Sequence, residues 1–362
     1  MARIKPAQRI HFTSAHLNAR LHEMIEGDTD RRWIDSHGET GLTSVLIPAY
    51  NAQTTITATL DSVWKQTYRP IEVVLIDDGS TDNTDAAIQA WTSSIPSRSD
   101  FIVRYFRQSN KGLLPCRNRS TLQSLGEYLQ YLDADDLLHP EKLESSINVL
   151  RKDVNTDVVV VRTLCFTEEN EALEALRLPA KVRAWGDAEI GVPILSRAFW
   201  YTLGPVFRRR IVEAAGPFPL KVHPVAEEVE FHARVKCVTN RIHYLPEVLT
   251  FHRVGGKSQL TGQLARVYRG KIDAVRWIEK IMLENGIADS REWRGLLRYS
   301  LSTTYAIGAC SPDRGLFEES LRQTKNLARS RGNLLSMVLS LIPSSLGVGV
   351  CKSVYAMRNR GD

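Results

Sequence analysis

The chain has 362 residues, of which 43% are hydrophobic and 24% are charged, so it can bury a large core as one elaborated domain or as two domains. Its net charge of +6 and pI near 9.0 are compatible with a nucleotide substrate or an anionic membrane surface, but they argue against a nucleic-acid-binding protein with dense Lys/Arg stripes. The five scattered cysteines show no CxxC spacing, which argues against a disulfide framework or a zinc site and indicates reduced thiols in a cytoplasmic protein.

Residues 1–40 are polar, lack the apolar core of a signal peptide, and are expected to form an N-terminal extension with a helix near Ala15–Ile25. From Thr43 onward, predicted strands and helices alternate. The strands are Thr43–Pro48, Ile71–Ile76, Phe101–Phe106 and Tyr128–Leu132, and the helices are Thr54–Lys65, Asn83–Trp91 and Leu113–Leu125. This alternation and the nearly continuous apolar strands predict an α/β fold, with a Rossmann-like, mostly parallel sheet flanked by helices.

Polar clusters follow three of these strands, where ligands bind in open α/β sheets. The clusters are Pro48-Ala49-Tyr50-Asn51, Asp77-Asp78-Gly79-Ser80 and Asp133-Ala134-Asp135-Asp136. Three carboxylates within four residues repel one another, and oxygen ligands suit Mg²⁺ or Mn²⁺. The alternative is a strand-to-helix turn in which Asp136 caps a helix that starts near Pro140.

The second half of the chain is less regular, with a strand-like stretch at Ile242–Thr250 and predicted helices at Gln263–Asn285, Arg291–Ala309 and Arg314–Arg331. Asn333–Val350 carries no charge and has basic flanks. Its proline, serines and glycines weaken the case for a membrane span, so an interfacial segment and a helix pair packed on the protein remain alternatives.

The ordered motifs resemble family 2 glycosyltransferases, which are inverting enzymes with the GT-A fold. The matching residues are Ser44–Asn51, Ile76–Thr84, Asn110-Lys111-Gly112, Arg117-Asn118 and Leu132–Asp136. The resemblance implies a glycosyltransferase domain over residues 41–260, with a nucleotide-binding half at 41–137 and an acceptor half at 138–260. A helical C-terminal region at 261–362, with membrane contact at 333–357 as one possibility, lies outside the resemblance.

The resemblance also implies roles for single residues. Pro48, Ala49 and Tyr50 would line the nucleoside pocket, and Asp78, with Asp77 beside it, would accept a hydrogen bond from the base. Further nucleotide-sugar contacts would come from Asn51, Gly112, Arg117, Asp133, Ala134 and Arg253. Asp135, with Asp133, would hold Mn²⁺ or Mg²⁺ against the diphosphate, and Asp136 would support them. His252 and Lys257 would be further phosphate donors.

Each role has an alternative that involves no ligand. Tyr50 could be an ordinary aromatic residue at a sheet edge, Asp78-Gly79-Ser80 a simple turn, and Arg117 a surface residue of a helix. The segment around Arg253 could be a plain surface loop.

The catalytic base is expected in the acidic run that follows Gly216-Pro217-Phe218. The resemblance places Glu228 at the position of the base, with Glu227 as the next candidate, although the family usually has Asp there. Glu reaches about one methylene further, and a misplacement of about 1 Å can cost roughly a hundredfold in rate. The alternative is a solvated acidic helix start formed by Glu227, Glu228 and Glu230.

Together these features predict a metal-dependent inverting glycosyltransferase. It would move one sugar from a nucleotide-sugar donor to a hydroxyl of a glycan, a lipid-linked saccharide or a protein, in the synthesis of cell-envelope polysaccharide. UDP or dTDP is favoured because Asp78 suits the imide N–H of uracil or thymine. The expected location is the cytoplasm, including the inner face of the plasma membrane.

Two other functions remain open. A non-catalytic protein that binds a sugar nucleotide or a glycan would explain the unusual Glu228. A nucleotidyltransferase is less favoured, because the first strand is followed by Pro-Ala-Tyr-Asn rather than by a Gly-rich loop with Lys or Arg.

Overall fold

The computed structural model describes residues 38–167, 200–218 and 227–254, with the side chains of the last segment described from Glu230 onward. The chain divides into two compact units. One unit comprises Met1–Lys221 and Phe231–Val254, and it holds nearly all of the described residues. The other comprises Val222–Glu230 and Gly255–Asp362, and only residues 227–230 of it are described.

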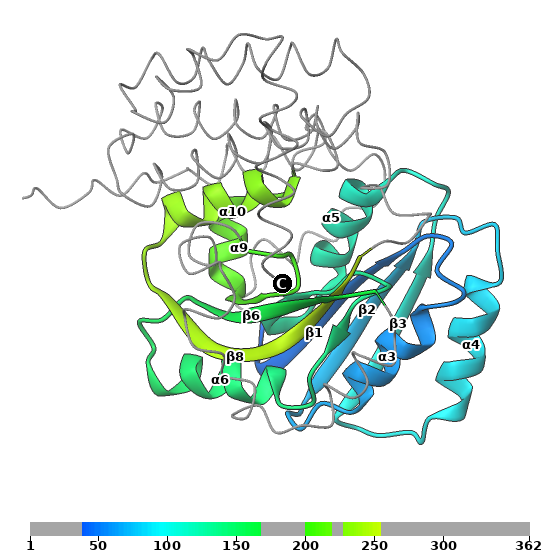
Figure 1. Cartoon of the computed structure of the whole chain (residues 1–362), viewed down its shortest axis with the longest axis horizontal. Coiled ribbons are helices and arrows are strands. Elements are labelled where there is room, and N and C mark those ends of the chain that lie inside the picture. Colours follow the sequence, from blue (N-terminus) through cyan, green and yellow to red (C-terminus); the bar gives the residue numbers. More distant parts are fainter. Residues whose placement is uncertain (1–37, 168–199, 219–226, 255–362) are drawn as a thin grey trace, which may run out of the picture. The chain divides into compact units, whose positions relative to one another are not determined.

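The described residues form one eight-stranded sheet with the order β3-β2-β1-β4-β7-β6-β8-β5 (Figure 1). The strands are β1 (Glu39–Ala49), β2 (Ile71–Asp77), β3 (Phe101–Arg107), β4 (Gly126–Tyr131), β5 (Leu137–Leu138), β6 (Val158–Phe166), β7 (Pro205–Arg208) and β8 (Ile242–Arg253). The first four strands pair in parallel, as do β6 and β8. The β4–β7, β6–β7 and β5–β8 pairs are antiparallel.

Helices cover both faces of this sheet (Figure 1). They are α3 (Ile56–Trp64), α4 (Thr84–Ser94), α5 (Leu113–Gln123), α6 (Lys142–Lys152), α9 (Arg209–Ala215) and α10 (Glu227–Val238). Side chains of a strand alternate between the two faces. Val73 and Leu75 of β2 therefore pack in the core beneath α3, α4 and α6, while Val74 and Ile76 pack in the core beneath α5, α9 and α10. This two-sided burial explains why β2 is an uninterrupted apolar run up to its last residues.

The predicted α/β fold with flanking helices is confirmed, and each strand and helix predicted between residues 43 and 132 is present. The ends shift by a few residues, most at β1, which begins at Glu39 rather than Thr43. The predicted strand at Ile242–Thr250 is the larger part of β8.

The interpretation of Asp136 as a helix cap is wrong. Helix α6 begins at Lys142 with Glu141 as its N-cap residue. The carboxylate of Asp136 instead contacts β8, as described below.

Several predictions lie outside the described residues. These are the helix near Ala15–Ile25, the three helices between residues 263 and 331, and the segment 333–357. In the part of the chain that is described, no helix is both long and apolar enough to cross a lipid bilayer. Among the cysteines described there, Cys116 is buried, Cys237 is half-buried and Cys165 is exposed.

One buried charge stands out within this fold. Lys142, at the start of α6, is fully buried, and its Nζ donates to the carbonyl of Gly204 at 2.9 Å and to Ser146 Oγ at 3.2 Å. Burial holds the pKa of the Lys142 ammonium well below its usual value of 10.5.

Replacing this lysine by methionine should therefore change stability in a way that depends on pH. Between its folded pKa and 10.5, Lys142 binds a proton more readily in the unfolded chain, so the wild-type protein loses stability as the pH falls. Lys142→Met removes this loss of stability and also removes the two hydrogen bonds of Nζ, each worth about 1 kcal/mol, at every pH. Urea unfolding at pH 7 and pH 9.5 should show Lys142→Met gaining stability relative to wild type at the lower pH. A difference that stays constant with pH would contradict this.

Candidate active site

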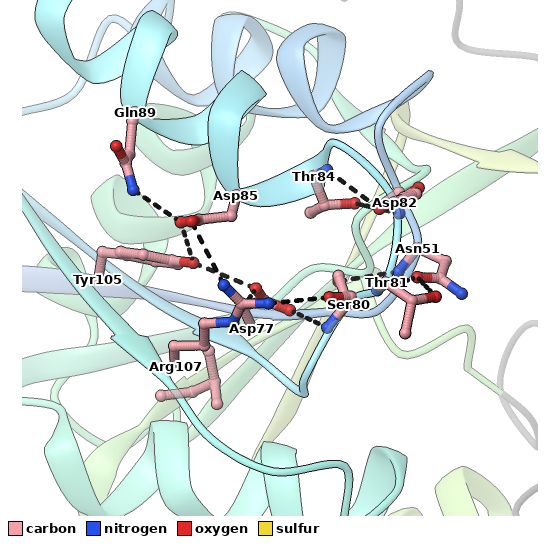
Figure 2. A network of polar contacts seen from close by, with 12 residues as sticks. Asn51, Asp77, Ser80, Thr81, Asp82, Thr84, Asp85, Gln89, Tyr105 and Arg107 are labelled. Carbon is pink, nitrogen blue, oxygen red and sulfur yellow. Dashed lines mark hydrogen bonds and ion pairs between the residues drawn. The ribbon is translucent and has the colours of Figure 1, made fainter.

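The loop after β1 is bound to the loop after β2. Ala49 is buried, whereas the Tyr50 side chain is half exposed at 50%. Asn51 has a left-handed backbone with φ of 50°, which asparagine tolerates better than most residues. Its Oδ1 accepts from the backbone N–H of Thr81 at 2.8 Å, and its own N–H donates to Ser80 Oγ at 3.0 Å (Figure 2). Asn51 thus fixes the chain next to the exposed Tyr50.

Asp77, the last residue of β2, anchors a polar network with the end of β3 (Figure 2). Its buried carboxylate accepts from the Ser80 N–H at 2.8 Å and from the Tyr105 hydroxyl at 3.2 Å, and it lies 3.4 Å from Arg107 Nε. Burial and the adjacent carboxylates of Asp85 and Asp77 raise the pKa of Tyr105. This tyrosine is therefore a neutral donor that holds both carboxylates in place.

The neighbouring Asp78 bonds to a different segment. Its carboxylate is 3% exposed and accepts from Gln108 Nε2 at 2.6 Å and from the N–H groups of Lys111 at 2.9 Å and Gly112 at 2.7 Å. Its own N–H donates to the Ala49 carbonyl at 2.8 Å. A carboxylate offers about four acceptor positions. The three bonds to the loop at 108–112 therefore leave about one position, on Oδ2, available to a ligand.

Arg117 of α5 reaches the carboxylate that follows β4. Its Nη2 lies 2.8 Å and 3.0 Å from the two oxygens of Asp133, and its guanidinium stacks over the Phe218 ring at 5.4 Å. Arg117 is only 2% exposed, so the interpretation of this residue as a surface side chain of a helix is wrong. The Asp133 side chain is 29% exposed, so the ion pair lies at the border between the core and the surface.

Asp136 links the end of β4 to the end of β8. Its buried carboxylate lies 3.0 Å from His252 Nδ1 and accepts from the N–H of Arg253 at 2.8 Å. Burial raises the pKa of Asp136 to about 7, and the bond to His252 opposes that shift. Arg253 Nε donates to the backbone carbonyl of Asp135 at 3.1 Å, which fixes the backbone of the acidic turn.

The donor set of this turn suits a hard cation that substrate phosphates help to bind. Asp133 is paired with Arg117, Asp136 is paired with His252, and Asp135 is half-buried. In the described segments, no three His, Cys, Asp or Glu side chains form a complete metal site. Mg²⁺ commonly takes only one or two carboxylates and completes its shell with water and phosphates, so the turn fits such an ion.

Some predicted site residues lie outside what the structure describes. The side chains of Glu227 and Glu228 and the whole of Lys257 are among them, although the backbone of α10 does begin at Glu227. The interpretation of this run as a solvated helix start is wrong for Glu230, which is 3% exposed.

Sequence reasoning singled out some partners of the predicted carboxylates, such as Arg117 and His252, but it missed Tyr105, Arg107 and Gln108. Tyr105 and Arg107 lie at the end of β3 and contact Asp77, and the signal for them is that they are polar residues at the end of a strand that neighbours β2. Gln108 also went unnoticed, because a single glutamine after a strand carries no distinctive pattern.

Known proteins resemble this chain in sequence. Residues 44–209 match the family described as glycosyl transferase family 2. An uncharacterized glycosyltransferase of Escherichia coli, YibD, is 29% identical over 167 residues, which are 46% of this chain and 44% of YibD. Chondroitin synthase of E. coli is 36% identical over 114 residues, which are 32% of this chain and 16% of that enzyme. The chain thus matches less than half the length of these relatives.

Solved structures resemble it in fold. S. aureus TarS 1-349 in complex with UDP-GlcNAc has a TM-score of 0.58 at 18% identity, covering 86% of this chain and 87% of that one. The mannosyltransferase PcManGT from Pyrobaculum calidifontis, in complex with GDP-Man and Mn²⁺, has a TM-score of 0.53 at 20% identity, covering 94% and 90%. The mixed sheet with helices on both faces is the GT-A fold. Residues 44–209, slightly less than half of the chain, match the family described as glycosyl transferase family 2.

Proposed function

We propose that this protein is a metal-dependent inverting glycosyltransferase that moves one sugar from a nucleotide-sugar donor to an acceptor hydroxyl. The observation that carries the proposal is the set of direct bonds among the ends of β1, β2 and β4 and the start of α5. These bonds hold the half-exposed ring of Tyr50, the carboxylate of Asp78 and the acidic turn at residues 133–136 on one compact unit. Such a set suits a ligand with a base, a sugar and a diphosphate.

The nucleoside would bind beside the loop after β1. Tyr50 offers an exposed ring for the base, and Pro48 and Ala49 form the buried floor next to it. The remaining acceptor position of Asp78 suits the imide N–H of uracil or thymine, so we propose UDP or dTDP as the nucleotide of the donor. TarS was solved with UDP-GlcNAc and with UDP, which agrees with this choice, whereas PcManGT was solved with GDP-Man.

The diphosphate would bind beside the acidic turn. We propose that Asp135, with Asp133 beside it, holds Mn²⁺ or Mg²⁺, and PcManGT was solved with Mn²⁺. When bound, the cation would stabilise the negative charge that develops on the leaving phosphate. Arg117 keeps Asp133 oriented, and Arg253 fixes the Asp135 backbone while its guanidinium lies over the Phe166 ring at 4.7 Å.

The acceptor hydroxyl must lose a proton as the new glycosidic bond forms. A single displacement needs one carboxylate base and no nucleophile on the enzyme, as in inverting glycoside hydrolysis. We assign the base to Glu228 at the start of α10, with Glu227 as the alternative, on the resemblance of this segment to the family. Because Glu is longer than the usual Asp, the acceptor would have to bind slightly further from the helix.

We propose a glycan, a lipid-linked saccharide or a protein as acceptor, in polysaccharide synthesis at the cytoplasmic side of the cell envelope. Support for this part comes from the name of one relative, chondroitin synthase. A non-catalytic sugar-nucleotide-binding protein is the second candidate, because Glu228 departs from the family pattern. The two candidates differ in whether any donor is turned over.

Removing the carboxylate of Asp135 should abolish the dependence of nucleotide binding on metal. We expect Mn²⁺ to strengthen UDP binding to the wild-type protein by about tenfold or more, and Asp135→Ala to lose that gain. Titration calorimetry with UDP, dTDP and GDP, each with and without Mn²⁺, measures this. Asp100→Ala, which removes a carboxylate just before β3 at the opposite edge of the sheet, is the control and should behave as wild type. A full metal effect in Asp135→Ala would refute the assignment.

Neutralising the proposed base should stop turnover and leave donor binding intact. We expect Glu228→Gln to lower kcat by about a hundredfold to ten-thousandfold, with little change in UDP affinity. Release of UDP from UDP-sugars measures turnover, and Glu227→Gln tests the alternative base. If Glu227→Gln loses activity and Glu228→Gln keeps it, Glu227 and not Glu228 is the base. Absence of turnover in a wild-type protein that binds UDP would favour the binding protein.

A further inference from the structure

Asp78 is bonded mainly to one loop of the structure. Three of its contacts go to one segment, residues 108–112, which connects β3 to α5. Two of the three donors are backbone N–H groups, those of Lys111 and Gly112, at the point where the chain turns into the helix. A buried carboxylate with fixed backbone donors is a strong restraint, because charged hydrogen bonds are roughly twice as strong as neutral ones.

A second contact between the same two segments is independent of that carboxylate. Gly79 has φ of 73°, and a Cβ atom placed on it would lie 2.9 Å from the backbone N of Asn110 and 3.0 Å from the carbonyl of Gln108. The backbone of residues 108–110 therefore packs directly on the turn after β2. The Gln108 N–H also donates to the Asp77 carbonyl at 2.9 Å. The backbone of the loop thus packs on the end of β2, and the Asp78 carboxylate orients the loop.

The loop in turn sets where α5 begins. Gly112, with φ of 92°, precedes the first helical residue, and its carbonyl accepts from the N–H of Cys116. Helix α5 also holds the Gln108 side chain. Arg119 Nη1 donates to Gln108 Oε1 at 2.9 Å, while Gln108 Nε2 donates to Asp78. Arg117, on the same helix, carries the ion pair with Asp133.

We propose that Asp78 is a positioning residue that fixes the loop at 108–112 and the start of α5, and so affects the diphosphate side of the site as well as the nucleoside side. A restraint on Gly112 is a restraint on the first turn of α5, and Arg117 lies in the second turn of that helix. The position of the Arg117–Asp133 pair then depends on the end of β2, through the loop and the first turn of α5. The consequence for the site rests on the proposed function, whereas the restraint on the loop does not.

The test compares Asp78→Asn with a matched variant, Asp85→Asn. An asparagine keeps the shape of Asp78 but turns an NH₂ group toward donors that need an acceptor. Asp85 lies nearby on α4 and bonds to Tyr105, Gln89 and Arg107 (Figure 2). Among the described residues, these side-chain partners of Asp85 all lie outside the loop at 108–112. Hydrogen exchange of the peptide that covers residues 108–116 is the first readout. We expect it to quicken by about tenfold or more in Asp78→Asn, relative to both wild type and Asp85→Asn.

Binding of inorganic pyrophosphate with Mn²⁺ is the second readout, because pyrophosphate has no base for Asp78 to contact. We expect its affinity to fall by about tenfold in Asp78→Asn and to stay unchanged in Asp85→Asn. Unchanged exchange of the loop would overturn the proposal, and so would a loss confined to ligands that carry a base. If the wild-type protein binds neither UDP nor pyrophosphate, the proposed function fails, and the exchange experiment alone decides whether Asp78 positions the loop.

Discussion

Two adjacent buried carboxylates at the end of β2 hold together the segments that follow β2 and β3. Taking a charged carboxylate out of water is costly unless fixed donors replace the lost solvent. Because side chains along a strand alternate between faces, Asp77 and Asp78 satisfy this demand from opposite sides. Asp77 uses the turn after β2 and the end of β3, whereas Asp78 uses the loop that begins α5. The donors that replace water around each carboxylate thus also order the segment that carries them.

In the acidic turn after β4, carboxylates are likewise satisfied by fixed donors that come from other segments of the chain. Arg117 comes from α5 and neutralises Asp133, while His252 and the Arg253 N–H come from β8 and satisfy Asp136. These contacts join the parallel part of the sheet to β8, which pairs with β6 on the far side of β7. Arg117 and His252 therefore lie against two of the three carboxylates of this turn. A site ordered in this way needs little reorganisation when charge develops on a bound diphosphate.

Positioning and ligand binding share residues in such a site. Three acceptor positions of Asp78 are used by the loop, which leaves about one for the proposed contact with a base, and the Asp133 carboxylate is partly used by Arg117. Substitution of these residues would therefore disturb local order and affinity together. This is why hydrogen exchange of the loop and binding of a ligand without a base separate the two proposed roles of Asp78 better than an activity measurement does.

The sequence by itself determined the alternation of strands and helices, the burial of the sheet on both faces, and the three polar strand ends that form the candidate site. These features are local: apolar periodicity sets which residues are buried, and carboxyl ends of parallel strands share one edge of the sheet. Tertiary structure alone decided the partners. Asp78 meets Gly112 across 34 positions of sequence, and Asp136 meets Arg253 across 117. Composition and periodicity carry no signal for such pairings, since they depend on how separate strands order themselves in the sheet. That is also why Arg117, polar and helical in sequence, is a buried ion-pair partner in the folded protein.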